Sequence, residues 1–142
     1  MSLIYLGRSR PGPALSIPFY QSRISAGFPS PADDYIERTL DLNELCIQHP
    51  SATFFLRVQG ESMIDAGILP DDVLVVDRSL QARCGDIVVA ALHGELTVKQ
   101  LELKPRPRLL PCNPQYQPIV LPEGEHLDIF GVVTNVVRSL KR

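Results

Sequence analysis

Residues 73–103 read VLVVDRSLQARCGDIVVAALHGELTVKQLEL, and this stretch contains three apolar runs separated by turn residues. The runs are Val73–Asp77, Asp86–Leu92 and Glu95–Leu103, and their many β-branched residues predict strands. His93-Gly94, between the last two runs, predicts a tight hairpin turn with its glycine at positive φ. Sequential strands joined by short turns indicate an antiparallel sheet.

The rest of the chain extends this pattern. Further strands are predicted at Thr53–Val58, Arg108–Leu110 and Asp128–Val137, with a loop over Pro111–Glu125. The 142 residues include 13 Pro, and no long helical pattern alternates with the strands. We therefore expect one mainly β domain, built as antiparallel sheets or a partial barrel.

One short helix is expected before the first of these strands. Asp41 can cap its first turn, with Glu44 three residues later in capping-box spacing, and Pro50 ends it. Its apolar stripe is formed by Leu40, Leu45 and Cys46.

The first 26 residues differ from the remainder in charge and composition. They contain Arg8, Arg10 and Arg23 and no acidic residue, so their formal charge is +3 and that of residues 27–142 is −5. The cluster Pro11-Gly12-Pro13 breaks any helical or strand period. We expect residues 1–26 to form an extended, flexible arm.

Composition excludes several classes of protein. A net charge of −2 and a pI near 5.9 do not fit a dedicated nucleic-acid binder. No apolar run approaches the roughly 20 residues of a membrane span, and no signal-peptide pattern opens the chain. Cys46, Cys84 and Cys112 have no disulfide or metal-ligand spacing, so we expect buried or idle thiols in a cytoplasmic protein.

Metal and phosphate sites are not expected. The histidines His49, His93 and His126 are far apart and lack ligand spacing, and no glycine-rich phosphate loop occurs. The adjacent acids Asp71-Asp72 are expected to form a turn and to be solvated. We therefore expect neither a metal ion nor a cofactor.

The candidate catalytic residues are a serine and a lysine. Ser62 follows a predicted strand in GESMIDAG (60–67), whose first glycine permits a sharp turn that can expose the hydroxyl beside backbone N–H groups. Lys99 shares a strand face with Thr97, and a lysine desolvated there can act as a general base for the serine. Two structural alternatives remain open: Ser62 as a cap or turn residue, and Lys99 as an edge-strand lysine.

Five segments, in a fixed order over about residues 25–140, carry a family resemblance. They are GESMIDAGI (60–68), DVLVVD (72–77), GDIVVA (85–90), GELTVK (94–99) and DIFGVV (128–133). Together they resemble the LexA/UmuD family of self-cleaving serine peptidases (S24), and GFPSPA (27–32) with QHPSAT (48–53) is similar to its UmuD/MucA-like branch. Only 26 residues precede Gly27, too few for the helix-turn-helix domain of the repressors, so we expect no sequence-specific DNA binding.

The resemblance implies a mechanism and a fold. Ser62 corresponds to the nucleophile, Lys99 to the general base and Ala26-Gly27 to the scissile pair. Cleavage would remove residues 1–26 and leave a peptidase and dimerisation domain, 27–142, with the mainly β fold of LexA-like peptidases.

The resemblance also implies partners in the SOS response to DNA damage. The chain would be a homodimer whose self-cleavage is stimulated by a RecA filament on single-stranded DNA. The processed form would be the accessory subunit of an error-prone, UmuC-like Y-family polymerase in translesion synthesis. The replicative polymerase and its sliding clamp are further expected partners, and a membrane is not.

Two other classes of protein remain open on the sequence alone. In the first, the chain is a non-enzymatic dimeric interaction module in which Ser62 and Lys99 are structural. In the second, it is a Ser–Lys protease that cuts other proteins, such as a signal peptidase, although it lacks a membrane anchor. A cut after Ala26 in pure protein at alkaline pH distinguishes self-cleavage from both.

Overall fold

The computed structural model describes residues 2–9, 12, 17–20, 36–122 and 125–141 of the 142-residue chain. These residues belong to two compact units. The larger combines Met1–Arg10 with His49–Arg142, and the smaller is Pro11–Gln48.

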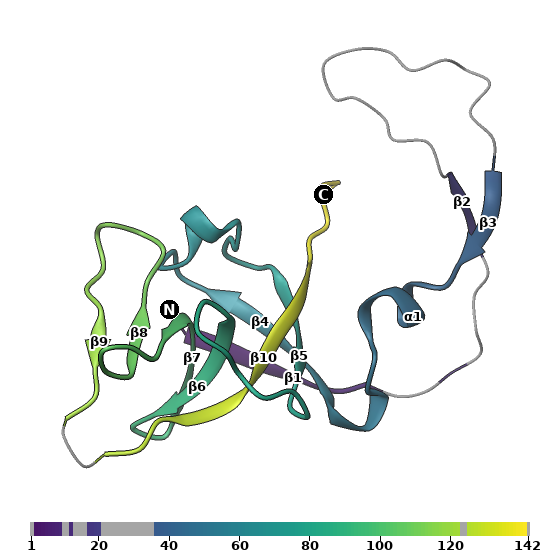
Figure 1. Ribbon diagram of the computed structural model, residues 1–142. Coiled ribbons are helices and arrows are strands. Elements are labelled where there is room, and N and C mark those ends of the chain that lie inside the picture. Colours follow the sequence, from purple (N-terminus) through teal and green to yellow (C-terminus); the bar gives the residue numbers. More distant parts are fainter. Residues whose placement is uncertain (1, 10–11, 13–16, 21–35, 123–124, 142) are drawn as a thin grey trace. The chain divides into compact units, whose positions relative to one another are not determined.

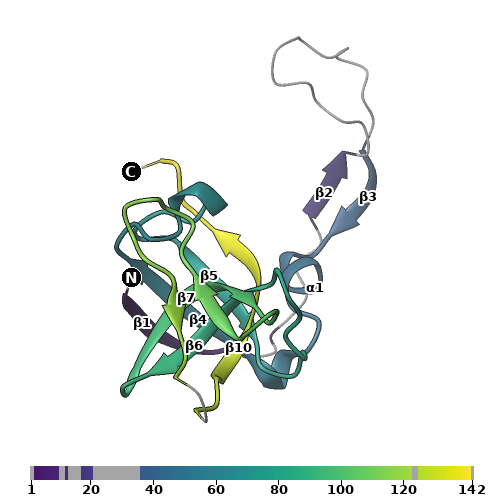
Figure 2. The ribbon, with the colours of Figure 1, turned by 60° about the vertical axis from the view of Figure 1, so that its left-hand side comes forward.

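The larger unit is built on one antiparallel sheet of eight strands (Figure 1). The strands are β1 (Ser2–Arg8), β4 (Thr53–Gln59), β5 (Val73–Asp77), β6 (Ile87–Leu92), β7 (Glu95–Glu102), β8 (Arg108–Leu110), β9 (Ile119–Val120) and β10 (Asp128–Val137). Their order across the sheet is β1-β4-β5-β10-β6-β7-β8-β9. The late strand β10 therefore lies between β5 and β6 and pairs with both, and Figure 2 shows it running beside β6.

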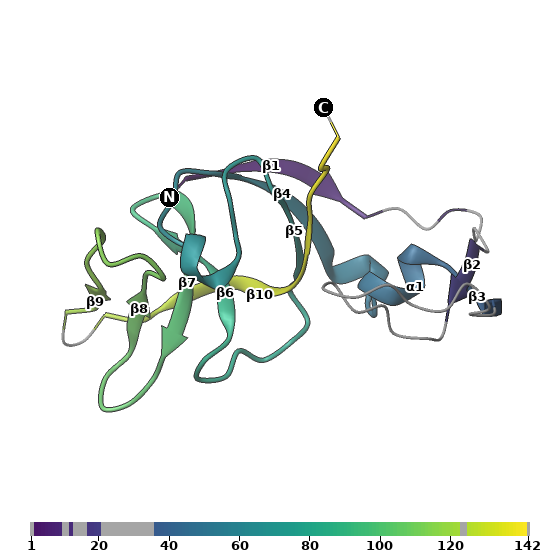
Figure 3. The same ribbon diagram turned by 90° about the horizontal axis from the view of Figure 1, so that it is seen from above.

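The sheet curls until β1 lies beside β7. Seen from above in Figure 3, β1 and β4 form one wall, and β6, β7 and β10 form the opposite wall. Buried apolar side chains from both walls meet in the core, including Leu56 and Val58 of β4 and Val89 and Val98 of β6 and β7. The expected mainly β, partial-barrel architecture is confirmed.

The strands expected from β-branched runs are found close to their expected positions. The bounds of β5, β8 and β10 are those that the sequence predicts. The hairpin between β6 and β7 is also confirmed: Leu92 lies opposite Glu95, and the two turn residues, His93 and Gly94, have φ of 50° and 80°. The short strand β9 was not expected, because the loop sequence around it is rich in turn residues.

Strand β10 bends closely past β5. At Gly131 its register with β6 shifts, and a Cβ added there would lie 2.7 Å from Cγ1 of Val76. Glycine is therefore required for the close approach of β10 to β5.

The N-terminal residues form a strand that composition did not indicate. Ser2–Arg8 pair antiparallel with β4 as strand β1, whereas the sequence suggested only an extended, flexible arm. The apolar run SLIYL supports pairing, but it lacks the alternation by which a half-buried strand is recognised.

The smaller unit contains one hairpin and one short helix. Strands β2 (Ile17–Tyr20) and β3 (Ile36–Leu40) pair antiparallel, and α1 (Leu42–Cys46) follows. The cap is confirmed, since Asp41 Oδ1 accepts from the N–H of Asn43 at 2.9 Å, but Leu45 of the expected apolar stripe is exposed. The expected scissile pair Ala26-Gly27 belongs to the connection between β2 and β3, outside the described residues, so the boundary after residue 26 stays a prediction.

Candidate functional site

Ser62 stands in the loop that follows β4. Gly60 has φ of 93°, the sharp turn expected there, and Met63 is fully buried in the core. A short 3-10 turn, η2 (Ile64–Ala66), follows and ends at Gly67, which has φ of 81°. Because Met63 is anchored between the two walls, the backbone of Ser62 is fixed at the edge of the core.

A second segment, after β8, holds the same loop in place. The N–H of Cys112 donates to the carbonyl of Ser62 at 2.8 Å, and the N–H of Asp65 donates to the carbonyl of Cys112 at 2.8 Å. The Asn113 side chain donates to the carbonyl of Glu61 at 2.9 Å. Neither supporting role could be recognised from the sequence, since Cys112 and Asn113 lie in a turn-rich loop with no motif of their own.

An ion pair closes the far end of the Ser62 loop. Asp72 is 1% exposed, and Arg138 donates to its two carboxylate oxygens at 2.6 Å each and to the carbonyl of Gly67 at 2.7 Å. The hydrogen bond from Arg138 lowers the pKa of Asp72, although burial opposes it. The expectation that Asp71-Asp72 is solvated is wrong for Asp72, because its partner lies far along the chain.

Ser62 and Lys99 are in direct contact. Nζ of Lys99 lies 3.0 Å from Oγ of Ser62, and it also donates to Oγ1 of Thr97 and to the carbonyl of Val98, each at 3.1 Å. Ser62 is fully buried rather than exposed, and Lys99 is 4% exposed. The strand alternation that places Thr97 and Lys99 on one face of β7 is thus found in the structure.

The surroundings of Lys99 disfavour its charged form. Among the described residues no carboxylate forms an ion pair with it. Burial lowers the pKa of Lys99 below its ordinary value of 10.5, and it outweighs the smaller effects that oppose it, of which the Cys112 thiol is the least. Burial and then the Asp65 carboxylate raise the pKa of that thiol, so it favours the neutral form. A neutral Lys99 can donate to Thr97 and Val98 and still direct its lone pair at the Ser62 hydroxyl.

A cleft leads along β7 to this pair. It has a volume of about 380 Å³ and is lined by His93, Leu96 and Lys99 together with Tyr116 and Ile119. Strand β8 pairs with β7 only at Gln100–Glu102, so it does not cover the β7 edge beside the cleft. The cleft therefore reaches Lys99, whose amine contacts the fully buried Ser62 hydroxyl.

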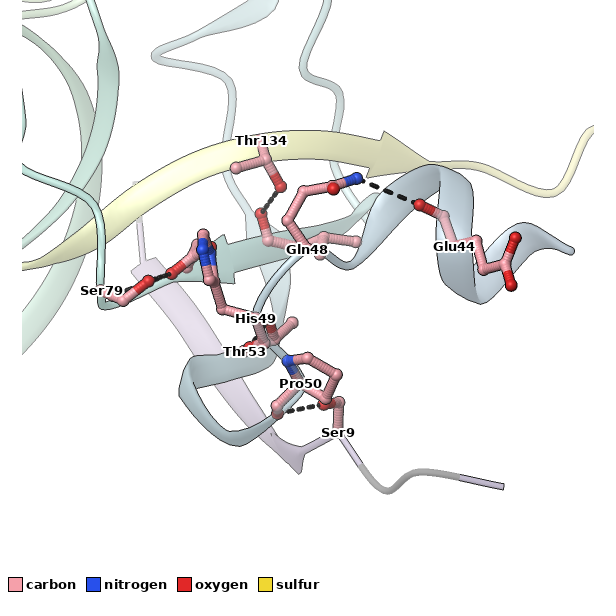
Figure 4. A network of polar contacts seen from close by, with 10 residues as sticks. Ser9, Glu44, Gln48, His49, Pro50, Thr53, Ser79 and Thr134 are labelled. Carbon is pink, nitrogen blue, oxygen red and sulfur yellow. Dashed lines mark hydrogen bonds and ion pairs between the residues drawn. The ribbon is translucent and has the colours of Figure 1, made fainter. Parts of the chain in front are cut away.

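A second cluster, His49 with Asp77 and Ser79, superficially resembles a catalytic triad (Figure 4). Nδ1 of His49 lies 2.6 Å from one oxygen of Asp77, and the Ser79 hydroxyl donates to the other at 2.6 Å. Burial would raise the pKa of Asp77, but these hydrogen bonds outweigh it and lower the pKa. Because Ser79 contacts the carboxylate and not the imidazole, no base activates its hydroxyl.

The remaining histidines and the cysteines have no arrangement among the described residues that indicates a catalytic or metal-binding role. His93 forms the hairpin turn, and His126 is exposed. Cys84 is exposed, and none of the three cysteines, all of which the structure describes, forms a disulfide. Within the described part of the chain, no group of three or more metal-ligating side chains comes together, and no helix is long and apolar enough to cross a membrane.

Comparison with known proteins gives consistent matches over most of the chain. The family model described as peptidase S24-like matches residues 18–134. Protein MucA of Salmonella typhimurium is 57% identical over 121 residues, covering 84% of this chain and 83% of that protein. Protein ImpA of Shigella flexneri is 52% identical over 126 residues, covering 87% and 85% respectively. The LexA repressor of Aromatoleum aromaticum is 40% identical over 131 residues, covering 91% of this chain and 64% of the repressor.

Proposed function

Because the chain belongs to the family of S24-like peptidases, we propose that Ser62 and Lys99 form a catalytic dyad that cuts the chain's own Ala26–Gly27 bond. The observation that carries the proposal is the 3.0 Å contact between the two buried side chains. Strong likeness to MucA and ImpA, over more than four-fifths of the chain, supports the same assignment.

The reaction needs one base that acts twice. Neutral Lys99 takes the proton of the Ser62 hydroxyl as Oγ attacks the Ala26 carbonyl carbon, and the oxyanion is stabilised by backbone N–H groups at Ser62. The resulting ammonium of Lys99 then protonates the nitrogen of Gly27, which leaves as a new amino terminus. Lys99 next takes a proton from water as the water oxygen attacks the acyl ester, and it returns that proton to Oγ of Ser62 as the ester bond breaks. Ala26 is left with a carboxylic acid that ionises, and Ser62 and neutral Lys99 are restored.

Both neighbours of Lys99 support this role. Thr97 and Val98 accept two hydrogen bonds from Nζ, which fixes the direction of the lone pair. Burial lowers the pKa of Lys99, so the neutral amine is accessible at a lower pH than for a solvated lysine. Protonated Lys99 cannot act as a base, so any change that favours the neutral amine should accelerate cleavage.

Substrate access explains why the chain would cut itself. The arm is covalently attached, so its effective concentration at the site is high and the binding of a separate substrate is not needed. An extended segment can enter the cleft along the uncovered edge of β7, and Ala26 and Gly27 are small enough to come close to Ser62. Proline at position 29 prevents regular pairing shortly after the scissile bond.

The test is self-cleavage of pure protein at alkaline pH. Mass spectrometry should find one new product that begins at Gly27, and Ser62→Ala should abolish it while leaving the circular dichroism spectrum unchanged. The matched control is Ser79→Ala, which removes the hydroxyl of an exposed serine hydrogen-bonded to Asp77 and should cut at the parent rate. Cleavage by Ser62→Ala would remove this serine from the mechanism, and a product with a different start would misplace the arm.

We further propose that this cleavage serves the SOS response. A RecA filament on single-stranded DNA would favour docking of the arm, and the product 27–142 would dimerise and join a UmuC-like Y-family polymerase, the replicative polymerase and its clamp. The support is the UmuD-like pattern of the sequence. Adding the filament at neutral pH should accelerate cleavage of the parent and not of Ser62→Ala. If the chain binds the polymerase but never cleaves itself, the protein is a non-enzymatic interaction module instead.

A further inference from the structure

Strand β1 is held on the sheet by backbone pairing more than by burial. It pairs with β4 in register from Ser2 opposite Gln59 to Arg8 opposite Phe54. Three of its apolar side chains, Ile4, Tyr5 and Leu6, are 42%, 53% and 44% exposed. Only Leu3 packs against the buried core, so little apolar area opposes the departure of β1.

The end of β1 adds polar and aromatic contacts that a different peptide could reproduce. The Arg8 side chain donates to the carbonyl of Ser51 at 3.1 Å, and its guanidinium lies 5.6 Å from the ring centroid of Phe54. Next to it, the Ser9 hydroxyl donates to the carbonyl of Pro50 at 2.6 Å, as Figure 4 shows. A peptide that makes these contacts needs one cationic and one hydroxyl side chain after an extended apolar run. The contacts place no further requirement on its sequence.

Cleavage after Ala26 would separate β1 from the rest of the chain. Once the covalent connection is broken, the segment is diluted into solution and its effective concentration at β4 falls by orders of magnitude. Strand β4 then becomes an edge strand whose outward N–H and C=O groups lack the partners that β1 supplied. The place of Leu3 against the core and the face of Phe54 become accessible at the same time.

We propose that the edge of β4 uncovered by the loss of β1 is a docking site for an extended segment of a partner protein. The segment pairs antiparallel with Thr53–Gln59. It places an apolar side chain where Leu3 now lies and a cationic side chain where Arg8 now lies. Strand β1 itself shows that the edge accepts this chemistry. Charge favours it as well, because residues 27–142 carry a formal charge of −5 and the segment that leaves carries +3.

This inference rests on the proposed cleavage, but its test does not need the cut. All proteins are full chains with Ser62→Ala and with the exposed Cys84 changed to serine. Two variants release β1: Leu3→Asp puts a charge against the core, and Gly7→Val strains β1 at a backbone φ of +143°. A third variant locks β1 in place by a disulfide between Ile4→Cys and Arg57→Cys, which are opposite and exposed.

The probe is a fluorescent synthetic peptide of residues 2–9, and its control carries aspartate in place of the leucine of position 3. Fluorescence anisotropy should show saturable binding to both released variants. The peptide should bind at least about tenfold more weakly to the parent and to the oxidised locked variant, a difference of about 1.4 kcal/mol. The control peptide should bind the released variants more weakly by at least the same factor.

Four results would overturn the proposal. The released variants could bind both peptides equally, or no more tightly than the locked form. They could form dimers through the free edge in sedimentation experiments, in which case a second copy is the occupant. Lastly, both could lose their sheet signal in circular dichroism, which would make β1 an inseparable part of the fold. Failure of self-cleavage in the active chain would remove the proposed function without changing any of these readouts.

Discussion

Replacing Lys99 by methionine should change how the stability of the fold depends on pH. Lys99 is 4% exposed and has no ion-pair partner among the described residues, and burial lowers its pKa from 10.5. Between its folded pKa and 10.5, the unfolded chain therefore binds one proton more than the folded chain at this residue. Stability of the parent must then rise with pH over that window, by about 1.4 kcal/mol for each pH unit.

The variant Lys99→Met lacks this dependence but keeps most of the buried side-chain volume. It also loses the hydrogen bonds to Ser62, Thr97 and Val98, each worth about 1 kcal/mol, which shifts its stability by an amount that does not depend on pH. The buried amine is therefore reported by the slope, against pH, of the difference in unfolding free energy between the two proteins. The sign of that difference at a single pH does not report it.

The assay is urea unfolding between about pH 7 and about pH 10. A background in which Gly27→Val has been shown to block the cut keeps both chains intact and leaves Ser62 in place. Other groups that titrate at alkaline pH are the same in both proteins, and their effects cancel in the difference. As a control, the exposed Lys104→Met should leave the pH dependence of the parent unchanged. If the parent and Lys99→Met differ by a constant amount at every pH, burial does not depress the Lys99 pKa and the general-base role loses its physical basis.

Three further changes test the support of the site and the scissile bond. Arg138→Ala should lower stability at neutral pH, because it removes the ion-pair partner of the buried Asp72 carboxylate. The loss should shrink as pH falls below about 4 and Asp72 takes up a proton, and urea unfolding at both pH values checks this. Gly131→Ala should cost about 2 kcal/mol in a thermal melt, since its Cβ would meet Val76 at 2.7 Å, and an unchanged melting temperature would refute the close approach of β10 to β5. Gly27→Val should prevent cleavage without unfolding the domain, because a β-branched residue cannot come close to the nucleophile; a normal rate, measured by mass spectrometry, would contradict the assigned bond.

Local features of the fold could be predicted because the residues that cause them are neighbours in sequence. The run VLVVD becomes β5 with the expected bounds, and the two-residue turn at His93-Gly94 follows from its glycine. Lys99 and Thr97 share a face because strand geometry alone requires it.

Features that depend on distant residues could not be predicted in this way. Asp72 looks like a solvated turn acid until Arg138, 66 residues later, is brought beside it. The supports of the Ser62 loop, Cys112 and Asn113, come from a loop without a motif, and only the completed sheet places them there. Residue chemistry alone made Lys99 a candidate base for Ser62, and the family resemblance favoured this pairing over the structural alternatives. Spacing along the chain could not show the contact, since it does not fix which strands become neighbours.

The central position of β10 has a consequence for the proposed self-cleavage during synthesis of the chain. The hairpin β4–β5 carries the Ser62 loop and the hairpin β6–β7 carries Lys99, and in the sheet each is joined to β10 and not to the other. Residues 128–137 leave the ribosome after both hairpins, so an incomplete nascent chain has the serine and the lysine but lacks the strand that unites their two halves. If the proposed self-cleavage holds, translation order would protect the arm, which is made first, from being cut before the whole domain exists.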